Sequence, residues 1–255
     1  MFLETDTFGG HVLQARLHGE DVFYIAPKVL HQAGQPRRGG VPILFPQFNN
    51  EGVFPKHGFA RVMAWKTIQP PEIGKTTGQH WRATLDANAM SVDSFMQNTS
   101  AKWPHHAELV IDAVIESSRL SIELTVKNIG TTEFSFTGGL HPYFCWPAGD
   151  IEVQQLGVRL SRDSMMQQGA GIEEKFLHRS DTLSVLSDGH KMTIKKFGFD
   201  EWMLWNPGPK HSLQDIEYED WQSFYCLEPI SSIKPHCLKP FEVFTGGFSI
   251  QIEPR

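Results

Sequence analysis

Cysteine is scarce in this chain, which has only Cys145, Cys226 and Cys237 among its 255 residues. Three scattered cysteines are too few for a disulfide framework, and their odd number fits a reducing compartment in which thiols stay free. The N-terminus MFLETDTFGG carries acids and lacks an apolar core, so we expect no secretory signal. Residues 134–149, the longest uncharged stretch near the middle, are interrupted by glycine and proline and cannot span a bilayer as a regular helix. These absences predict a cytoplasmic protein without membrane contact.

Basic residues are also in deficit, because 23 Lys and Arg stand against 29 Asp and Glu, for a formal net charge of −6. This charge is a poor match to a polyanion, so we expect no nucleic-acid partner. No P-loop, no GxGxxG after a strand, no HExxH and no GxSxG occurs. The histidine and cysteine pairs 105–106 and 236–237 are adjacent, and adjacent residues of a strand point to opposite faces, so we expect no metal site.

Alternation of apolar and polar residues is the dominant pattern. It runs through 107–128, where a short SSR connection predicts a hairpin, and returns at 248–253. Helical signal is confined to 91–99 and one turn at 211–216. With no internal repeat and no linker, the sequence predicts one all-β domain over 1–255, built from antiparallel sheets as a sandwich or barrel with little helix.

Two segments concentrate basic residues beside unusual backbone. RRGGVPILFPQF (37–48) combines Gly-Gly with two prolines, which excludes a central strand. KHGFAR (56–61) adds a second arginine, and Arg38 with Arg61 could clamp a carboxylate or phosphate through paired hydrogen bonds. Each segment could instead be a solvated surface loop.

Three further segments gather aromatic residues around single polar groups. In TGGLHPYFCW (137–146), His141 has the surroundings of an acid or base with a tuned pKa, although a lone histidine is more often structural. FDEWMLWNPGP (199–209) offers a flat aromatic face of the kind on which sugar rings stack. In WQSFYCLEPI (221–230), Glu228 follows an apolar run and precedes a proline. A carboxylate at a strand end can face a cleft, although taken by itself Glu228 is more often a surface residue.

Taken together, these segments resemble the aldose 1-epimerase superfamily, and within it the hexose-6-phosphate mutarotase (glucose-6-phosphate 1-epimerase) branch. The resemblance is carried, in the order of the family, by RGGVPILFPQF (38–48), HGFAR (57–61), LHPYF (140–144), WNPG (205–208) and YCLEP (225–229). It implies a galactose-mutarotase-like β-supersandwich, in agreement with the alternation.

The resemblance also implies roles for single residues. His141 falls on the catalytic histidine of the family and Glu228 on its catalytic glutamate. Arg38 and Arg61 fall on arginines associated with substrate binding, including the phosphate, and His57 lies beside the pocket.

The resemblance also bears on three further positions of the substrate site. Trp205 of the WNP motif is expected to bind substrate. The acid upstream of it that contacts sugar hydroxyls is either Asp200 or Glu201, and we favour Asp200. Lys56 stands where the branch often has glutamine, so it could add a phosphate contact or mark a different substrate.

The implied activity interconverts the α and β anomers of a hexose 6-phosphate and needs no cofactor. Glu228 would take the proton of the O1 hydroxyl while His141 protonates the ring oxygen O5. The expected partner is a small sugar or sugar phosphate, and the expected state is a monomer. Two alternatives stay open: a neutral-sugar aldose 1-epimerase, and a non-catalytic sugar-binding β-sandwich. Glycoside hydrolysis normally needs two carboxylates, whereas here the second partner is a histidine.

Overall fold

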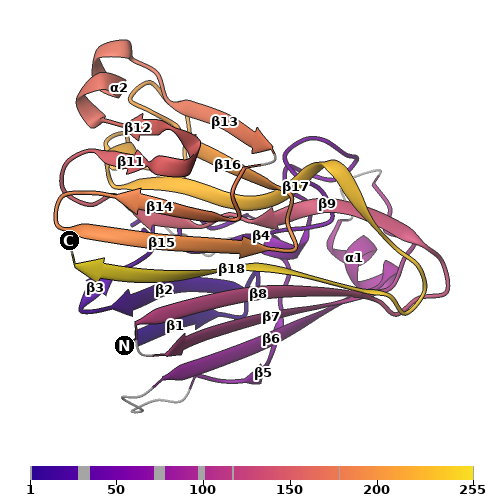
Figure 1. Cartoon of the computed structure of the whole chain (residues 1–255). Helices are drawn as coiled ribbons and strands as arrows, with labels where there is room; N and C mark the ends of the chain where they lie inside the picture. Colours follow the sequence, from indigo (N-terminus) through magenta and orange to yellow (C-terminus); the bar gives the residue numbers. More distant parts are fainter. Residues whose placement is uncertain are drawn as a thin grey trace.

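The computed structural model describes residues 2–27, 35–71, 78–96, 101–116, 118–177 and 179–254, whose strands form antiparallel sheets (Figure 1). The largest is a nine-stranded sheet. Its order is β12 (Val158–Leu160), β11 (Ile151–Val153), β14 (Thr182–Leu186), β15 (His190–Phe197), β18 (Val243–Pro254), β8 (Arg119–Asn128), β7 (Ala107–Glu116), β6 (Gln79–Ala87) and β5 (Lys66–Gln69).

A six-stranded sheet lies behind it in Figure 1 and carries the residues of interest. Its order is β13 (Ile172–Leu177), β16 (Glu201–Asn206), β17 (Phe224–Leu238), β9 (Phe134–Leu140) and β4 (Ile43–Leu44), with β10 (Tyr143–Cys145) paired to β17. A three-stranded sheet contains β1 (Phe2–Asp6), β2 (His11–Leu17) and β3 (Glu20–Asp21). Side chains from all these sheets belong to one large hydrophobic core, so the sheets are packed on one another.

Helix is a minor component of the described residues. Its segments are α1 (Ala89–Phe95), α2 (Arg162–Gln168) and the 3₁₀ turns η1 (Ala60–Val62), η2 (Gln154–Leu156) and η3 (Asp220–Gln222). Helix α1 confirms the helical signal at 91–99, of which 97–99 lie outside the described residues, but 211–216 contains bends and no helix. The sequence did not predict α2. No helix in the described residues combines the length and apolar character that a membrane span requires.

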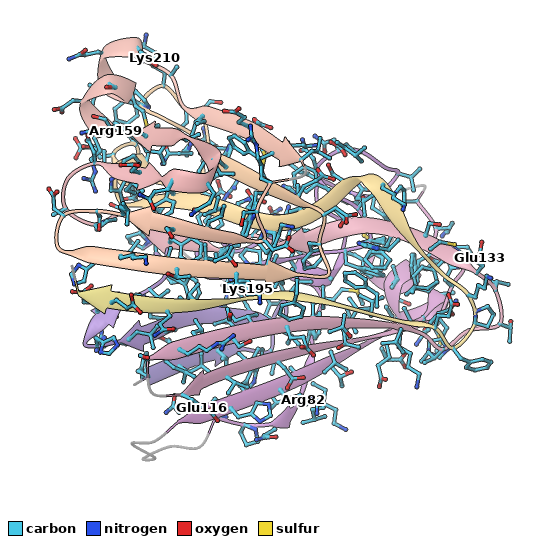
Figure 2. The ribbon with its side chains drawn as sticks, in the orientation of Figure 1. Arg82, Glu116, Glu133, Arg159, Lys195 and Lys210 are labelled. Carbon is cyan, nitrogen blue, oxygen red and sulfur yellow. The ribbon has the colours of Figure 1, made fainter. Side chains whose placement is uncertain are left out.

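The predicted hairpin is confirmed by β7 and β8, which pair in register from Ala107 opposite Asn128 to Glu116 opposite Arg119. Apolar side chains alternate inward along both strands, because successive residues of a strand point to opposite faces. The other face is polar, and Figure 2 shows Arg82 projecting from this side of the sheet.

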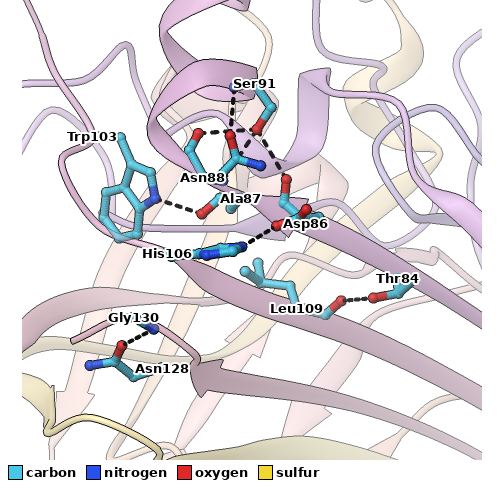
Figure 3. A network of polar contacts seen from close by, with 10 residues as sticks. All are labelled: Thr84, Asp86, Ala87, Asn88, Ser91, Trp103, His106, Leu109, Asn128 and Gly130. Atoms are coloured by element: carbon cyan, nitrogen blue, oxygen red, sulfur yellow. Dashed lines mark hydrogen bonds and ion pairs between the residues drawn. The ribbon is translucent and has the colours of Figure 1, made fainter. Parts of the chain in front are cut away.

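A polar network stabilises the junction between the end of β6 and the start of α1 (Figure 3). The side chain of Asn88 accepts a hydrogen bond from the Ser91 backbone (2.9 Å), and the Ser91 hydroxyl accepts one from the Asn88 backbone (3.2 Å). This capping box satisfies amides that the helix leaves unpaired. Trp103 Nε1 donates to the Ala87 carbonyl (2.9 Å) and anchors the following segment to the same strand.

The proline-rich segment 37–48 contributes only β4, which lies at the edge of its sheet and pairs Ile43 with Leu140. Its exclusion from a central strand is therefore confirmed. The extent of a single domain over 1–255 stays a prediction.

Candidate active site

A buried histidine and a buried glutamate meet at the centre of the six-stranded sheet. His141 follows directly after β9, and its Nε2 lies 3.3 Å from Oε1 of Glu228 on the neighbouring strand β17. Their side chains are only 7% and 2% exposed. The other polar atoms of the pair, His141 Nδ1 and Glu228 Oε2, are buried without a hydrogen-bond partner. Buried polar atoms are nearly always satisfied, so this pair has the character of a reactive site.

Glu228 does not end a strand, which corrects one expectation. It is the fifth residue of β17, which runs from Phe224 to Leu238, and the next residue, Pro229, still pairs with Trp202. A proline removes only its own backbone donor, so here it does not stop the strand. The carboxyl group is therefore held by a central strand with neighbours on both sides.

Aromatic rings fix the orientation of His141. Its imidazole stacks on the ring of Tyr143 at a centroid distance of 4.7 Å and an angle of 10°. Trp205 meets the imidazole edge-on at 5.8 Å, and His57 does so at 5.7 Å. The predicted Trp205 and His57 are therefore brought to His141, and a ring packed on several sides keeps one rotamer.

Arg38 is held beside this aromatic group by two hydrogen bonds. Its Nε donates to Asp215 Oδ2 (2.7 Å) and its Nη1 donates to the Tyr143 hydroxyl (3.0 Å). Burial acts to lower the pKa of Arg38, but Tyr143 and Asp215 together raise it above its ordinary value. The guanidinium also lies 5.9 Å from the centroid of the Trp205 ring. Arg38 is therefore a fixed cation.

The segment 56–61 supplies two more cations. Arg61 Nη2 donates to the carbonyl of Lys56 (2.7 Å), while its Nε is buried without a partner. Burial lowers the pKa of Arg61 to about 10, which still leaves it charged at neutral pH. The Lys56 side chain is exposed, yet its charge acts on both His141 and Glu228. Arg37 Nη2 pairs with Asp6 at 2.6 Å.

The backbone of the same segment explains its HG sequence. His57 and Gly58 both have positive φ, at 66° and 76°. A Cβ on Gly58 would overlap the carbonyl of Phe45, so only glycine fits there. The His57 backbone donates to the Asn49 carbonyl (2.8 Å), and the Asn49 backbone donates to His57 Nδ1 (3.1 Å), which leaves the ring proton on Nε2.

The protonation of the central pair follows from its surroundings. Burial raises the pKa of Glu228 well above its ordinary value, and the nearby carboxylate of Glu173 raises it further. Burial lowers the pKa of His141 well below its ordinary value, and Arg38 and Arg61 lower it further. The raised pKa of Glu228 favours its protonated form and the lowered pKa of His141 favours its neutral form, so both shifts disfavour an ion pair. Without substrate, the structure favours a neutral imidazole beside a protonated carboxyl group.

Comparison with known proteins shows the family to which the chain belongs. The sequence model of the family described as aldose 1-epimerase matches residues 4–172, more than half of the chain. The chain belongs to the aldose 1-epimerase family. A relative from Cenchrus ciliaris, provisionally named a glucose-6-phosphate 1-epimerase, is 26% identical over 271 residues that cover 97% of this chain and 80% of the relative. A relative from Escherichia coli strain K12 with the same provisional name is 27% identical over 252 residues, 86% of this chain and 76% of the relative.

The fold agrees with this family. The solved structure of YeaD from Salmonella typhimurium, provisionally described as a mutarotase, superposes with a TM-score of 0.79 at 19% identity and covers 99% of this chain and 87% of that chain. The predicted galactose-mutarotase-like β fold with little helix is thereby confirmed. The protein is an isomerase of the mutarotase type, and its partner is a small sugar.

The two acids considered upstream of Trp205 occupy different environments in this aldose 1-epimerase. Asp200 is exposed just before β16, and its backbone donates to Ser231 Oγ (3.2 Å), so the structure does not bring Asp200 into the buried group. Glu201 is fully buried at the start of β16. Its carboxylate accepts hydrogen bonds from the Ser232 backbone (2.8 Å) and hydroxyl (2.7 Å), which is the pattern of a structural acid.

Sequence reasoning missed three members of the group. Tyr143 lies inside the LHPYF motif two residues after His141, a spacing that places both on one face of an extended chain, so it could have been found. Asp215 comes from a segment without regular structure, and no local pattern distinguished it. Glu173 lies on β13 opposite Trp205 and acts on Glu228, but its exposed position in a charged run gave no signal.

Groups of three or more His, Cys, Asp or Glu side chains that could hold a metal ion do not occur within the described ranges.

Proposed function

We propose that this protein interconverts the α and β anomers of a hexose 6-phosphate, with His141 and Glu228 as the acid–base pair and without a cofactor. The observation that supports it most strongly is the 3.3 Å contact between two buried groups of perturbed pKa beside a fixed arginine. Perturbed acids and bases that share a site are typical of proton-transfer catalysis.

The reaction needs two proton transfers and no electron transfer. Glu228, as a carboxylate, takes the proton of the O1 hydroxyl, while His141, as an imidazolium, delivers a proton to the ring oxygen O5. The C1–O5 bond breaks and the open aldehyde forms. After rotation about the C1–C2 bond, His141 takes its proton back as O5 attacks the opposite face, and Glu228 returns a proton to O1. Each positioned catalyst contributes ~10²–10⁴-fold.

The phosphate is assigned to the cations. Arg38 and Arg61 act on each other and on His141, so both lie near the pair, and Lys56 adds a third positive charge. Arginine recognises phosphate through paired hydrogen bonds, and binding remote from C1 positions the reacting carbon. This local cluster offsets the overall charge of −6. The names of the curated relatives support the same substrate class.

The sugar ring is assigned to the aromatic and acidic side chains beside the pair. Trp205 supplies an apolar face for ring C–H groups, and Glu173, whose charge reaches Glu228, is an acceptor for sugar hydroxyls. We assign this role to Glu173 in place of Asp200, because the charge of Glu173 acts on Glu228, whereas that of Asp200 acts on His236. His57 completes the wall beside His141. The free cysteines support a cytoplasmic enzyme, and we take it to act as a monomer.

Exchange NMR of anomeric protons tests the proposal. Glucose 6-phosphate, glucose and galactose are each measured with and without the protein, with E228Q as the inactive control. We expect acceleration for the phosphate alone. Equal acceleration of the neutral sugars would refute the phosphate assignment and leave a general aldose 1-epimerase. Binding without acceleration of any sugar would refute catalysis and leave a sugar-binding module.

A further inference from the structure

A chain of contacts joins the fixed arginine to the acid–base pair. The Tyr143 hydroxyl accepts a hydrogen bond from Arg38 Nη1 (3.0 Å), and the ring of Tyr143 lies flat on the imidazole of His141, 4.7 Å away. Tyr143 is only 2% exposed, and Cys226 pairs with it across the strands, so the ring has little room to move. The position of the guanidinium is thereby tied to the face of the imidazole.

The charged groups around the pair come from several elements. The cations Arg38, Lys56 and Arg61 and the neutral His57 face His141, while Glu173 on β13 faces Glu228, and Asp215 faces the two arginines. Arg38 lowers the pKa of both His141 and Glu228, and it is tied to His141 in particular through the stacked ring of Tyr143. A negative charge bound to Arg38 therefore changes the affinity of His141 for a proton more than that of Glu228.

We propose that Tyr143 is a positioning residue that couples anion binding at Arg38 to the protonation of His141, so that the phosphate of the substrate moves a proton from Glu228 to His141. This inference rests on the proposed function. The proton leaves a carboxyl oxygen of Glu228 and binds Nε2 of His141, so one O–H bond breaks, one N–H bond forms, and no electrons are exchanged.

The transfer creates the two catalysts that ring opening needs. Glu228 becomes the carboxylate that can accept the O1 proton, and His141 becomes the imidazolium that can protonate O5. Without the phosphate, both groups stay neutral and neither role is available. The phosphate therefore contributes to kcat as well as to binding, and neutral sugars are turned over slowly even when they enter the site.

The protonation of His141 can be observed directly by ¹⁵N NMR of the full chain labelled at histidine, because a mutarotase at anomeric equilibrium can be saturated with substrate indefinitely. At neutral pH we expect one protonated ring nitrogen on His141 in the free protein and two when glucose 6-phosphate saturates the site. If the protein turns over glucose 6-phosphate and His141 still carries one proton, the coupling is refuted while the proposed function stands. If glucose 6-phosphate is not turned over, the proposed function fails and the coupling with it.

Kinetics of Y143F test the role of the tyrosine itself. The variant keeps the ring against His141 and removes the hydroxyl that holds Arg38. We expect kcat for glucose 6-phosphate to fall by about tenfold, less than the ~10²–10⁴-fold of a general catalyst because both catalysts remain in place, with a smaller change in KM. The alkaline limb of the kcat profile should move to lower pH, because His141 loses its proton more easily.

Y24F is the matched control. The Tyr24 hydroxyl donates to Asp220 (2.6 Å) and its ring belongs to the same aromatic cluster as Tyr143, but Arg38 does not bond to it. We expect Y24F to keep the kcat and pH profile of the natural protein. If Y143F and Y24F behave alike in both readouts, Tyr143 only fills space and the proposal is wrong.

Discussion

Replacing Glu228 by glutamine separates the catalytic role of this residue from its cost to stability. The side chain keeps its size and can still hydrogen-bond to His141, but it can neither ionise nor accept a proton from O1. Since one general catalyst contributes ~10²–10⁴-fold, we expect kcat to fall by that factor, which corresponds to about 2.7–5.4 kcal/mol in the barrier. Sugar binding should change little.

The same variant should be more stable than the natural protein at raised pH. Burial raises the pKa of Glu228 in the folded state above the ordinary value of 4.5. Above that ordinary value the unfolded chain releases this proton while the folded protein keeps it, so stability falls as pH rises, until the folded-state pKa is reached. The slope for one full proton is about 1.4 kcal/mol per pH unit. E228Q has no carboxyl group at this position, so this fall in stability with rising pH should be absent from the variant.

Two assays check the two halves of this prediction. Exchange NMR measures turnover of glucose 6-phosphate, and urea unfolding from about pH 5 to about pH 8 measures the stability difference. Turnover retained by E228Q would remove Glu228 as the base. A stability difference that stays constant with pH would refute the assignment of a protonated, buried carboxyl group.

Three further predictions concern two histidines and the proposed phosphate site. H141A should lose most of the rate, by ~10²–10⁴-fold in exchange NMR, and a rate near that of the natural protein would make His141 structural. R61A should raise KM for glucose 6-phosphate far more than for glucose, and equal changes would make Arg61 structural. Burial lowers the pKa of His11 from 6.5 to about 4. As the pH falls, the unfolded chain therefore binds a proton at His11 at a higher pH than the folded protein does. Stability should therefore fall as pH drops from 6.5 towards 4, by up to about 3 kcal/mol, and H11Q should remove that slope in urea unfolding.

Much of the fold could be predicted because strand alternation is a local property. The pattern at 107–128 specified both strands of the hairpin and their inward faces without knowledge of the rest of the chain. Strand ends were less predictable. Glu228 was expected at an end because Pro229 follows it, whereas the surrounding strands carry β17 through the proline.

The motifs of the sequence determined which residues belong to the candidate site, and most of them lie together in the structure. Arg38, His57, Arg61, His141 and Glu228 were all named from short motifs whose residue types suit proton transfer and anion binding. Asp200 was the exception. Neighbouring residues at the start of a strand point to opposite sides, so a shift of one residue exchanges the buried Glu201 for the exposed Asp200.

Only the tertiary structure decided how these residues act on one another. Asp215 reaches Arg38 across 177 positions of sequence, and such a contact is set by how the sheets are ordered and packed, which no local pattern encodes. The same holds for the charge of Glu173 on Glu228. The sequence by itself determined the chemical groups, whereas their protonation states follow from burial and from the distances between charges, which exist only in the folded chain.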